Sequence, residues 1–244
     1  EVPDWDSLGH MKIIAEIGSV HDGKINLAIQ LIKLATKCGV DIVKFQMHLA
    51  EHETLKKAPS PKYFKNEDRY NYFKRTSFNL KQWKKIKKTC IEQKVEFLCS
   101  PFSVEAVEIL EKLKVKKYKI PSGELTNIPL LEKVVKTKKP IILSTGMSNF
   151  KEIDTAYSIC KKSDLTIMQC SSIYPCPEKL SGINILKEFK KRYNCKIGYS
   201  DHTQGMSSSI LASYLGAKYI EKHFTSSKKI VWKRCKIFNG TQKF

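Results

Sequence analysis

The sequence of 244 residues lacks a long hydrophobic run, since no apolar stretch reaches the roughly 18 residues that a membrane span requires. It lacks a secretion signal as well, because the N-terminus is acidic and no apolar segment follows it. Low-complexity tracts and repeats of long period are also missing. We therefore expect a cytoplasmic protein that does not associate with membranes.

Closely spaced cysteine pairs are missing too. The eight cysteines are scattered along the chain, and none forms the CxxC spacing of a zinc ribbon. Without a secretion signal, we interpret them as reduced thiols.

Acidic residues are few, at 24 against 44 Lys and Arg, which gives a formal net charge of +20. Such a charge raises the possibility of nucleic-acid binding. However, the lysines are spread through every predicted helix, and no compact basic block with interleaved aromatic residues stands out. A lysine-rich solvated surface explains this pattern better, so we expect no nucleic-acid partner. The same surface would attract an anionic substrate.

Short β-rich runs alternate with lysine-rich amphipathic segments, a pattern that predicts a parallel sheet. Eight such units in a chain of this length favour a (β/α)₈ TIM barrel, which needs roughly 250 residues, over an open sheet. The predicted strands are 13–18, 41–46, 96–102, 118–122, 140–146, 165–171, 196–201 and 219–225. The predicted helices are 26–38, 80–93, 104–113, 128–137, 150–161, 183–192 and 206–215.

Local signals support these boundaries. Asn79 and Gln82 fit a capping box, and Gly39 fits the residue that ends the first helix. The connection between Gln46 and Asn79 is long and rich in aromatic residues, which usually indicates a functional loop. A surface segment packed on its own aromatic side chains is the alternative.

Three parts of the chain are distinguished. Residues 1–10 are interpreted as an N-terminal extension or an expression remnant, 11–225 as the barrel, and 226–244 as a divergent basic tail. The tail carries no amphipathic helix of useful length, so we expect the last barrel helix to be missing or irregular.

Polar side chains recur at the end of every predicted strand, where a barrel of this class carries its active site. Lys44 and Lys119 lie within strands, and a buried lysine needs an anionic partner. Serine hydroxyls beside them would form a phosphate-binding cradle. Internal salt bridges to Glu16, Glu124 or Glu221 are the alternative for these lysines.

His202 and His223 end consecutive strands, and neighbouring strands lie about 4.8 Å apart. Two imidazoles at matching depth could share one metal ion, with substrate and water completing its shell. Ordinary hydrogen-bonding histidines are the alternative.

Several segments stand out along the chain, namely AEIGSVHDG at 15–23, KFQ at 44–46, SPFS at 100–103, YKIPSGE at 118–124, ILSTGM at 142–147, CSSIYPCP at 170–177, GYSDHT at 198–203 and GAKYIEKHFT at 216–225. Together, and in this order, they make the chain resemble the sialic acid synthases, the N-acetylneuraminate synthase family. Val20 gives the first segment the form of the spore-coat polysaccharide branch, which leaves the sugar open.

The resemblance implies a (β/α)₈ barrel that condenses phosphoenolpyruvate with an N-acetylmannosamine-like aldehyde, forming a nonulosonic acid and releasing phosphate. It implies a divalent ion, Mn²⁺ first and Mg²⁺ or Co²⁺ as other candidates, bound by His202 and His223. The residues that would bind phosphoenolpyruvate are Lys44, Ser100, Lys119, Ser122, Ser144, Ser172 and Ser200. Gln46, Glu124 and Tyr174 would contact the sugar, and Glu16 would orient or deprotonate a water.

Members of this family continue into a last barrel helix and a small antifreeze-like domain, neither of which is recognisable in residues 226–244. We therefore expect either a barrel that binds metal and phosphoenolpyruvate with weak turnover, or a shortened helix with activity retained. The family also suggests a homodimer. Rival hypotheses are another phosphoenolpyruvate–aldose synthase, a catalytically inactive scaffold, and an RNA-binding protein.

Overall fold

The computed structural model describes residues 11–57 and 67–226. The chain divides into two compact units. We call the one built from 15–116, 173–175 and the residues from His223 onward the N-terminal unit. The C-terminal unit is built from 117–172, 176–222 and the residues up to Ile14. Each unit is described by itself below.

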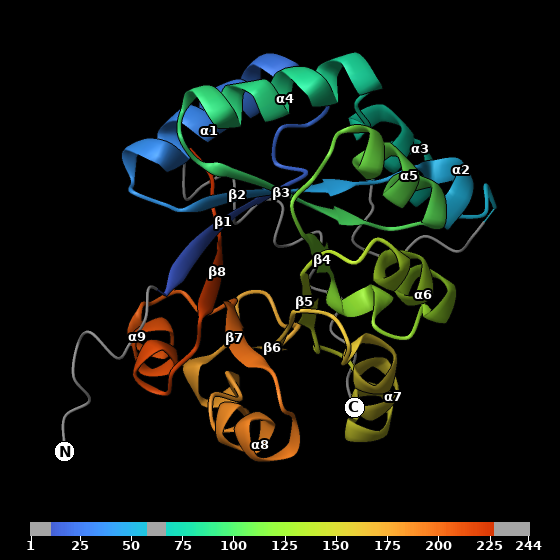
Figure 1. Cartoon of the computed structure of the whole chain (residues 1–244). Helices are drawn as coiled ribbons and strands as arrows, with labels where there is room; N and C mark the ends of the chain where they lie inside the picture. The colour runs from blue at the N-terminus through green and yellow to red at the C-terminus, as the bar shows by residue number, and fades with distance from the viewer. Residues whose placement is uncertain (1–10, 58–66, 227–244) are drawn as a thin grey trace. The chain divides into compact units, whose positions relative to one another are not determined.

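Eight strands alternate with helices along the chain and form one sheet in the order β3-β2-β1-β8-β7-β6-β5-β4 (Figure 1). Strand β2 pairs with β3, and β4 through β8 pair in succession, in each case parallel. This confirms the predicted (β/α)₈ TIM-barrel fold class. The strands are β1 (Lys12–Gly18), β2 (Ile42–Met47), β3 (Glu96–Pro101), β4 (Tyr118–Ile120), β5 (Ile141–Ser144), β6 (Leu165–Cys170), β7 (Lys196–Asp201) and β8 (Tyr219–His223).

The helices of the N-terminal unit are α1 (Ile25–Lys37), α2 (Ala50–Glu53), α3 (Arg69–Thr76), α4 (Leu80–Glu92) and α5 (Val104–Lys112). The buried residues of α1 recur at helical spacing, namely Ala28, Leu31, Ile32 and Ala35, so one face of the helix packs inward. Its neighbour α4 lies beside it (Figure 1). The predicted capping box of α4 is present: Asn79 and Gln82 each accept a hydrogen bond from the other's backbone N–H at 2.9 Å.

The helices of the C-terminal unit are α6 (Ile128–Lys136), α7 (Phe150–Cys160), α8 (Ile185–Arg192) and α9 (Ser207–Tyr214), with short 3₁₀ turns at Ser122–Glu124 and Glu178–Leu180. Strand β6 is buried over its whole length, as expected for a parallel strand covered on both faces. A second capping box, between Asn149 and Glu152, starts α7.

The long connection after β2 differs from the predicted loop, because it contains α2 and α3. Asp68 caps α3 by accepting the backbone N–H of Asn71 at 2.9 Å. Tyr70, Tyr72 and Phe73 of α3 form a buried cluster with Ala50 of α2. Aromatic side chains at helical spacing thus order part of this segment, whereas its residues 58–66, including Tyr63 and Phe64, lie outside the described residues.

Several predictions fall on parts of the chain that the structure does not describe. The N-terminal extension 1–10 and residues 227–244 of the basic tail, including Cys235, lie outside the described residues. The other seven cysteines are free. Among residues 11–57 and 67–226, no helix combines the length and apolar character of a membrane span.

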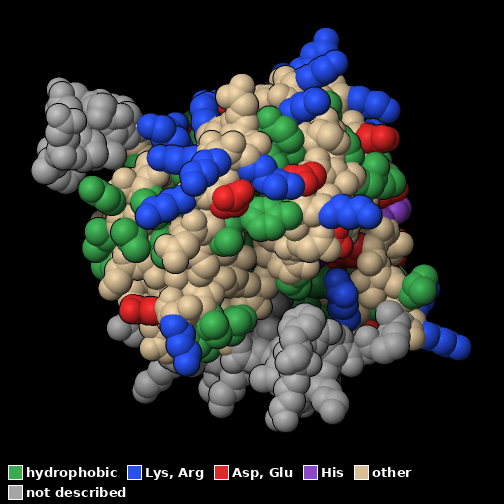
Figure 2. Space-filling view, turned by 90° about the horizontal axis from the view of Figure 1, so that it is seen from below, with side chains coloured by type: hydrophobic (Ala, Val, Ile, Leu, Met, Phe, Trp, Pro, Cys, Tyr) green, Lys and Arg blue, Asp and Glu red, His purple; other side chains and the backbone are tan. Residues whose placement is uncertain are grey.

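Basic side chains are distributed over the surface. Figure 2 shows lysines and arginines spread over one face, interspersed with apolar and few acidic side chains. This distribution agrees with the interpretation of the +20 charge as a solvated lysine-rich surface.

We predict that Asn79→Ala lowers the free energy of unfolding by about 1 kcal/mol, because it removes the side-chain acceptor at the start of α4. Urea denaturation measures the change. Lys81→Ala, at an exposed position in the first turn of the same helix, is the control and should shift stability by less than about 0.5 kcal/mol. Equal shifts in both variants would show that the cap contributes nothing.

Candidate active site

A buried cluster in the N-terminal unit joins Glu16 of β1 to Lys44 and Gln46 of β2; we call it the Glu16 cluster. Lys44 Nζ lies 2.7 Å from Glu16 Oε2, and both side chains are almost fully buried. Gln46 Nε2 donates to the other carboxylate oxygen, Oε1, at 2.7 Å. Lys44 and Gln46 share one face of β2 because side chains alternate along a strand. The cluster therefore holds an ionised carboxylate in a fixed orientation.

A glycine leaves room for this arrangement. Gly18 has φ +52°, and a Cβ there would lie 3.1 Å from Glu16 Oε1 and 3.5 Å from Gln46 Nε2. The segment that ends β1 thus needs a residue without a side chain, both for its backbone conformation and for its proximity to the cluster.

Ser100 lies next to this cluster, opposite Gln46 in the pairing of β2 with β3. Its side chain is fully buried, and its hydroxyl has no hydrogen-bond partner among the described residues. Buried polar groups in proteins are almost always hydrogen-bonded. An unpartnered buried hydroxyl at a strand end is what a ligand-binding group would show before its ligand is added.

The C-terminal unit contains a second buried cluster, formed by Lys119 of β4, Ser144 of β5, Ser200 of β7 and Glu221 of β8; we call it the Lys119 cluster. Lys119 Nζ donates to Ser144 Oγ at 2.5 Å and lies 3.6 Å from Glu221 Oε2. Ser200 Oγ donates to Glu221 Oε1 at 3.4 Å. Side chains of four different strands therefore form one cluster, in which Ser144 and Glu221 contact the ammonium group and Ser200 contacts Glu221.

Both lysines thus have an internal carboxylate partner, which is the alternative that the sequence left open. The partners are Glu16 for Lys44 and Glu221 for Lys119. Glu124 accepts a hydrogen bond from Asn127 Nδ2 at 2.7 Å. A paired lysine retains its positive charge in a buried place, so it still presents that charge to an anion.

Two further serines converge over Gly146. Ser122 Oγ accepts the Gly146 backbone N–H at 3.0 Å. A Cβ added at Gly146 would lie 2.8 Å from Ser122 Oγ and would collide with Ser172 Oγ. The absence of a side chain at position 146 therefore lets two of the predicted substrate-binding hydroxyls approach the same backbone.

His202 follows β7, and a hydrogen bond to the backbone orients its ring. Its Nδ1 lies 2.8 Å from the carbonyl oxygen of Ser171, so the Nδ1–H donates there. Such a bond fixes the ring tautomer and leaves Nε2 as the nitrogen without a proton when the ring is neutral, as metal-binding histidines require.

Cys170 lies beside His202, with Sγ 3.9 Å from Nδ1. Burial opposes ionisation of this thiol, but the charge of His202, hydrogen bonds from His202 and Ser122, and the charge of Lys119 together lower its pKa to about 7. Burial likewise disfavours the imidazolium, yet Cys170, the Ser171 carbonyl and Glu221 raise the pKa of His202. No role for Cys170 could be predicted from the sequence, because its proximity to His202 follows from side chains that meet across strands.

His223, at the end of β8, contacts Tyr174 edge to face, with ring centroids 5.3 Å apart. The structure thus brings two predicted site residues together within the N-terminal unit. His202 belongs to the C-terminal unit. In the described ranges 11–57 and 67–226, no group of three or more His, Cys, Asp and Glu side chains could hold a metal ion.

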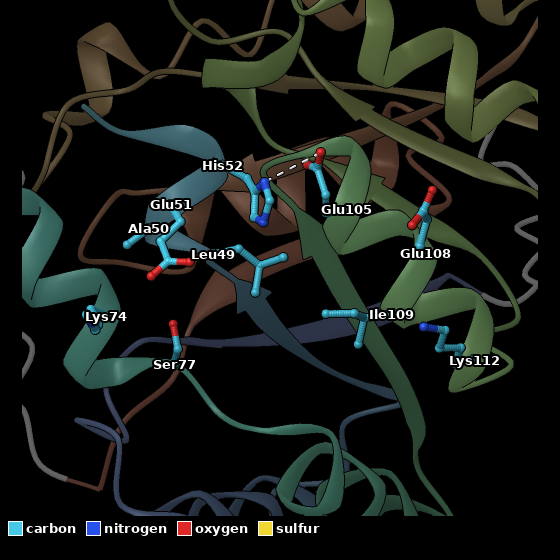
Figure 3. Close-up of a pocket in the computed structure, with 10 residues that line it drawn as sticks. All are labelled: Leu49, Ala50, Glu51, His52, Lys74, Ser77, Glu105, Glu108, Ile109 and Lys112. Carbon is cyan, nitrogen blue, oxygen red and sulfur yellow. Dashed lines mark ion pairs between the residues drawn. The ribbon is translucent and has the colours of Figure 1, made fainter. Parts of the chain in front are cut away.

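A cavity of about 360 Å³ in the N-terminal unit lies apart from the predicted residues (Figure 3). Its walls come from α2, α3 and α5, and His52 pairs with Glu105 across it at 3.5 Å. Both side chains are about half exposed. The cavity is lined by Leu49, Ala50, Glu51, His52, Lys74, Ser77, Glu105, Glu108, Ile109 and Lys112, and the sequence did not predict it.

Comparison with known proteins gives consistent matches. The profile described as the NeuB family matches residues 31–235. An N,N'-diacetyllegionaminic acid synthase from Campylobacter jejuni is 38% identical over 228 residues, which cover 89% of this chain and 68% of that protein. The chain spans about two thirds of the length of the curated relatives it matches.

Solved structures agree with these matches. The crystal structure of an N-acetylneuraminic acid synthetase from Leptospira borgpetersenii is similar with a TM-score of 0.81 and 30% identity, covering 97% of this chain and 87% of that one. A spore coat polysaccharide biosynthesis protein from Bacillus subtilis is similar with a TM-score of 0.78 and 27% identity, covering 95% and 67%.

We predict that Gly146→Ala lowers the free energy of unfolding by roughly 1–3 kcal/mol, because its methyl group overlaps the two serine hydroxyls. Gly123→Ala is the matched control, since a Cβ there would meet only Met147 Cε, at 3.9 Å. Thermal or urea unfolding of both variants measures the difference. A Gly146→Ala protein as stable as the control would contradict the close approach of Ser122 and Ser172.

Proposed function

The chain belongs to the NeuB family, and we propose that it condenses phosphoenolpyruvate with an amino-sugar aldehyde to a nonulosonic acid, releasing inorganic phosphate. The observation that carries this proposal is a buried lysine in each unit: Lys119, which contacts the Ser144 hydroxyl, and Lys44, whose strand β2 pairs with the strand of the buried Ser100. Family relatives bear the names of synthases for such acids.

The anionic groups of phosphoenolpyruvate suit the residues present. The phosphate and the carboxylate both need cationic and hydroxyl donors, and charge-assisted hydrogen bonds are the stronger ones. Lys44 with Ser100 supplies such donors in the N-terminal unit, and Lys119 does so in the C-terminal unit together with Ser122, Ser144, Ser172 and Ser200. The unpartnered hydroxyl of Ser100 supports this assignment.

The proposed reaction begins when C3 of the enol phosphate attacks the aldehyde carbon, forming a carbon–carbon bond. The aldehyde oxygen takes up a proton, and C2 becomes cationic. Water then adds to C2 and loses its proton to Glu16. Finally the hydroxyl group on C2 gives its remaining proton to the departing phosphate as the bond from C2 to the phosphate oxygen breaks, and a ketone remains. Glu16 suits the role of base because Lys44 and Gln46 hold it ionised and oriented.

Departure of phosphate is the step at which negative charge leaves the substrate. Preorganised donors stabilise such a developing charge without having to reorient. Lys119 is preorganised in this sense, since Ser144 and Glu221 fix its ammonium group.

We propose that His202 and His223 bind the divalent ion, with Mn²⁺ the first candidate and Mg²⁺ or Co²⁺ the others. The hydrogen bond from His202 Nδ1 to the Ser171 carbonyl fits a metal-binding histidine, because it directs the lone pair to Nε2. When bound, such an ion would polarise the sugar aldehyde as a Lewis acid.

We assign contact with the sugar to Gln46, Glu124 and Tyr174. The relatives are named for different acids, legionaminic and N-acetylneuraminic, so the acceptor is proposed only as an N-acetylmannosamine-like amino sugar. A homodimer remains a proposal that follows from the family.

A coupled phosphate-release assay tests the proposed function. The purified chain is incubated with phosphoenolpyruvate, Mn²⁺ and a panel of N-acetylated amino sugars. Phosphate release that depends on both substrates supports the proposal. Release with arabinose 5-phosphate or erythrose 4-phosphate in place of the amino sugars would instead indicate another phosphoenolpyruvate–aldose synthase.

We predict that Lys119→Met raises the apparent KM for phosphoenolpyruvate by about 10- to 100-fold, the value of one charge-assisted hydrogen bond, and changes the KM for the sugar far less. Lys117→Met, two residues earlier, is the control and should leave both constants unchanged. Equal effects of Lys119→Met on both substrates would identify a structural lysine.

We predict that His202→Ala and His223→Ala each weaken Mn²⁺ binding at least about tenfold, because each removes a proposed ligand. Isothermal titration calorimetry with Mn²⁺ measures the affinity of the purified variants. His52→Ala removes a half-exposed histidine paired with Glu105 and should leave it unchanged. Wild-type affinity in both site variants would refute the assignment.

A further inference from the structure

His48 is a buried histidine to which neither the sequence motifs nor the proposed reaction gives a role. It follows β2 directly, and its side chain is 6% exposed. The ring lies between two phenylalanines, with centroids 3.9 Å from Phe73 of α3 and 4.0 Å from Phe102 after β3. Its backbone carbonyl accepts a hydrogen bond from Ser77 Oγ at 2.7 Å. The residue therefore has little freedom to move.

Both ring nitrogens of His48 make polar contacts. Nδ1 lies 3.0 Å from each carboxylate oxygen of Glu53, the last residue of α2. Nε2 lies 3.2 Å from Gln46 Oε1. The ring thus links the long connection after β2 to a residue of the Glu16 cluster.

The orientation of the Gln46 amide follows from its other neighbour. Glu16 is ionised, since its Oε2 pairs with Lys44 at 2.7 Å, so its Oε1 can only accept. The amide group 2.7 Å away from Oε1 must then be the NH₂ of Gln46, which leaves the amide oxygen facing His48. A carbonyl oxygen accepts, so Nε2–H of His48 donates to it, while Nδ1–H donates to the Glu53 carboxylate in the ion pair of the protonated ring.

A continuous chain of hydrogen bonds results, from Glu53 through His48 and Gln46 to Glu16. Reversing the amide would place its oxygen against the Glu16 carboxylate and its NH₂ against a donating imidazole. Both contacts would be repulsive and would leave buried polar groups unsatisfied. Glu16 and His48 therefore favour the same one of the two amide orientations, and His48 is the partner that holds the amide oxygen.

We propose that His48, fixed by Glu53 and by the two phenylalanine rings, is a positioning residue that sets the orientation of Gln46 and, through it, of the Glu16 carboxylate. The proposal rests on the function proposed above, in which Gln46 contacts the sugar and Glu16 accepts the proton of water. It also gives the connection with α2 and α3 a purpose, because these helices supply Glu53 and Phe73.

The kinetic test compares three variants in the phosphate-release assay. His48→Phe keeps an aromatic ring between Phe73 and Phe102 and removes both hydrogen bonds. His48→Gln keeps an N–H donor that can reach Gln46. His52→Phe is the matched control, because His52 lies on the same connection and also pairs with a glutamate, Glu105 of α5, but lines the cavity of Figure 3.

His48→Phe is expected to lower kcat and raise the KM for the sugar, reducing kcat/KM for the sugar by roughly 10- to 100-fold. The KM for phosphoenolpyruvate should stay within about twofold, since the ion pair of Lys44 with Glu16 does not need His48. His48→Gln should recover part of the loss, and His52→Phe should behave as wild type. Equal changes in both KM values, or no change at all, would overturn the proposal.

A second measurement does not depend on the proposed function. A double-mutant cycle combines His48→Phe with Gln46→Leu and reads the urea midpoint; His52→Phe with Gln46→Leu is the control cycle. Non-additive effects are expected only in the first cycle, and additivity there would refute the link between His48 and Gln46. If no sugar supports phosphate release, the proposed function fails while this cycle still decides whether His48 holds Gln46. Should His48→Phe not fold, the same cycle is run with His48→Gln.

Discussion

The pairing of each buried lysine with a carboxylate is the constraint on which the candidate site depends. An isolated ammonium group in a protein interior would lose its proton or destabilise the fold, so each lysine must be accompanied by an anion. Lys44 has Glu16 and Lys119 has Glu221, in both cases on a different strand of the same unit. The register of the strands therefore determines whether the site can exist at all. Gln46, Ser144 and Ser200 hydrogen-bond to members of these pairs, and Gly18 leaves room beside Glu16.

Much of the fold can be predicted from the sequence alone, because its strands are apolar runs and several of its helices begin at recognisable capping residues. Strand β7 begins and ends where the pattern predicts, and the capping box at Asn79 marks the start of α4. The packing of the connection after β2 on its own aromatic side chains was one of the predicted alternatives, but its helices α2 and α3 were not predicted, since both are short and charged. What orders them is the packing of Tyr70, Tyr72 and Phe73, a tertiary effect that periodicity in a short segment does not show.

The sequence also predicts most of the candidate site residues, because the ends of strands can be recognised in a chain in which strands and helices alternate. It could not decide the partners of these residues, since ion pairs and hydrogen bonds between strands depend on register. The pairing of Lys119 with Glu221, the proximity of Cys170 to His202, and the linkage from Glu53 to Glu16 through His48 are all properties of the three-dimensional structure. His48 lies two residues after Gln46, and nothing in a single sequence indicates that its side chain would contact that glutamine.

The fate of the oxygen atom that bridges carbon and phosphorus in phosphoenolpyruvate tests the central claim most directly. In the proposed reaction water adds to C2, so the bond between C2 and the bridging oxygen breaks. With oxygen-18 in the bridge, mass spectrometry should find the label in the released phosphate and a solvent-derived oxygen at C2 of the sugar acid. Label retained at C2 of the product would show that the phosphorus–oxygen bond breaks instead, and would contradict the role assigned to Glu16.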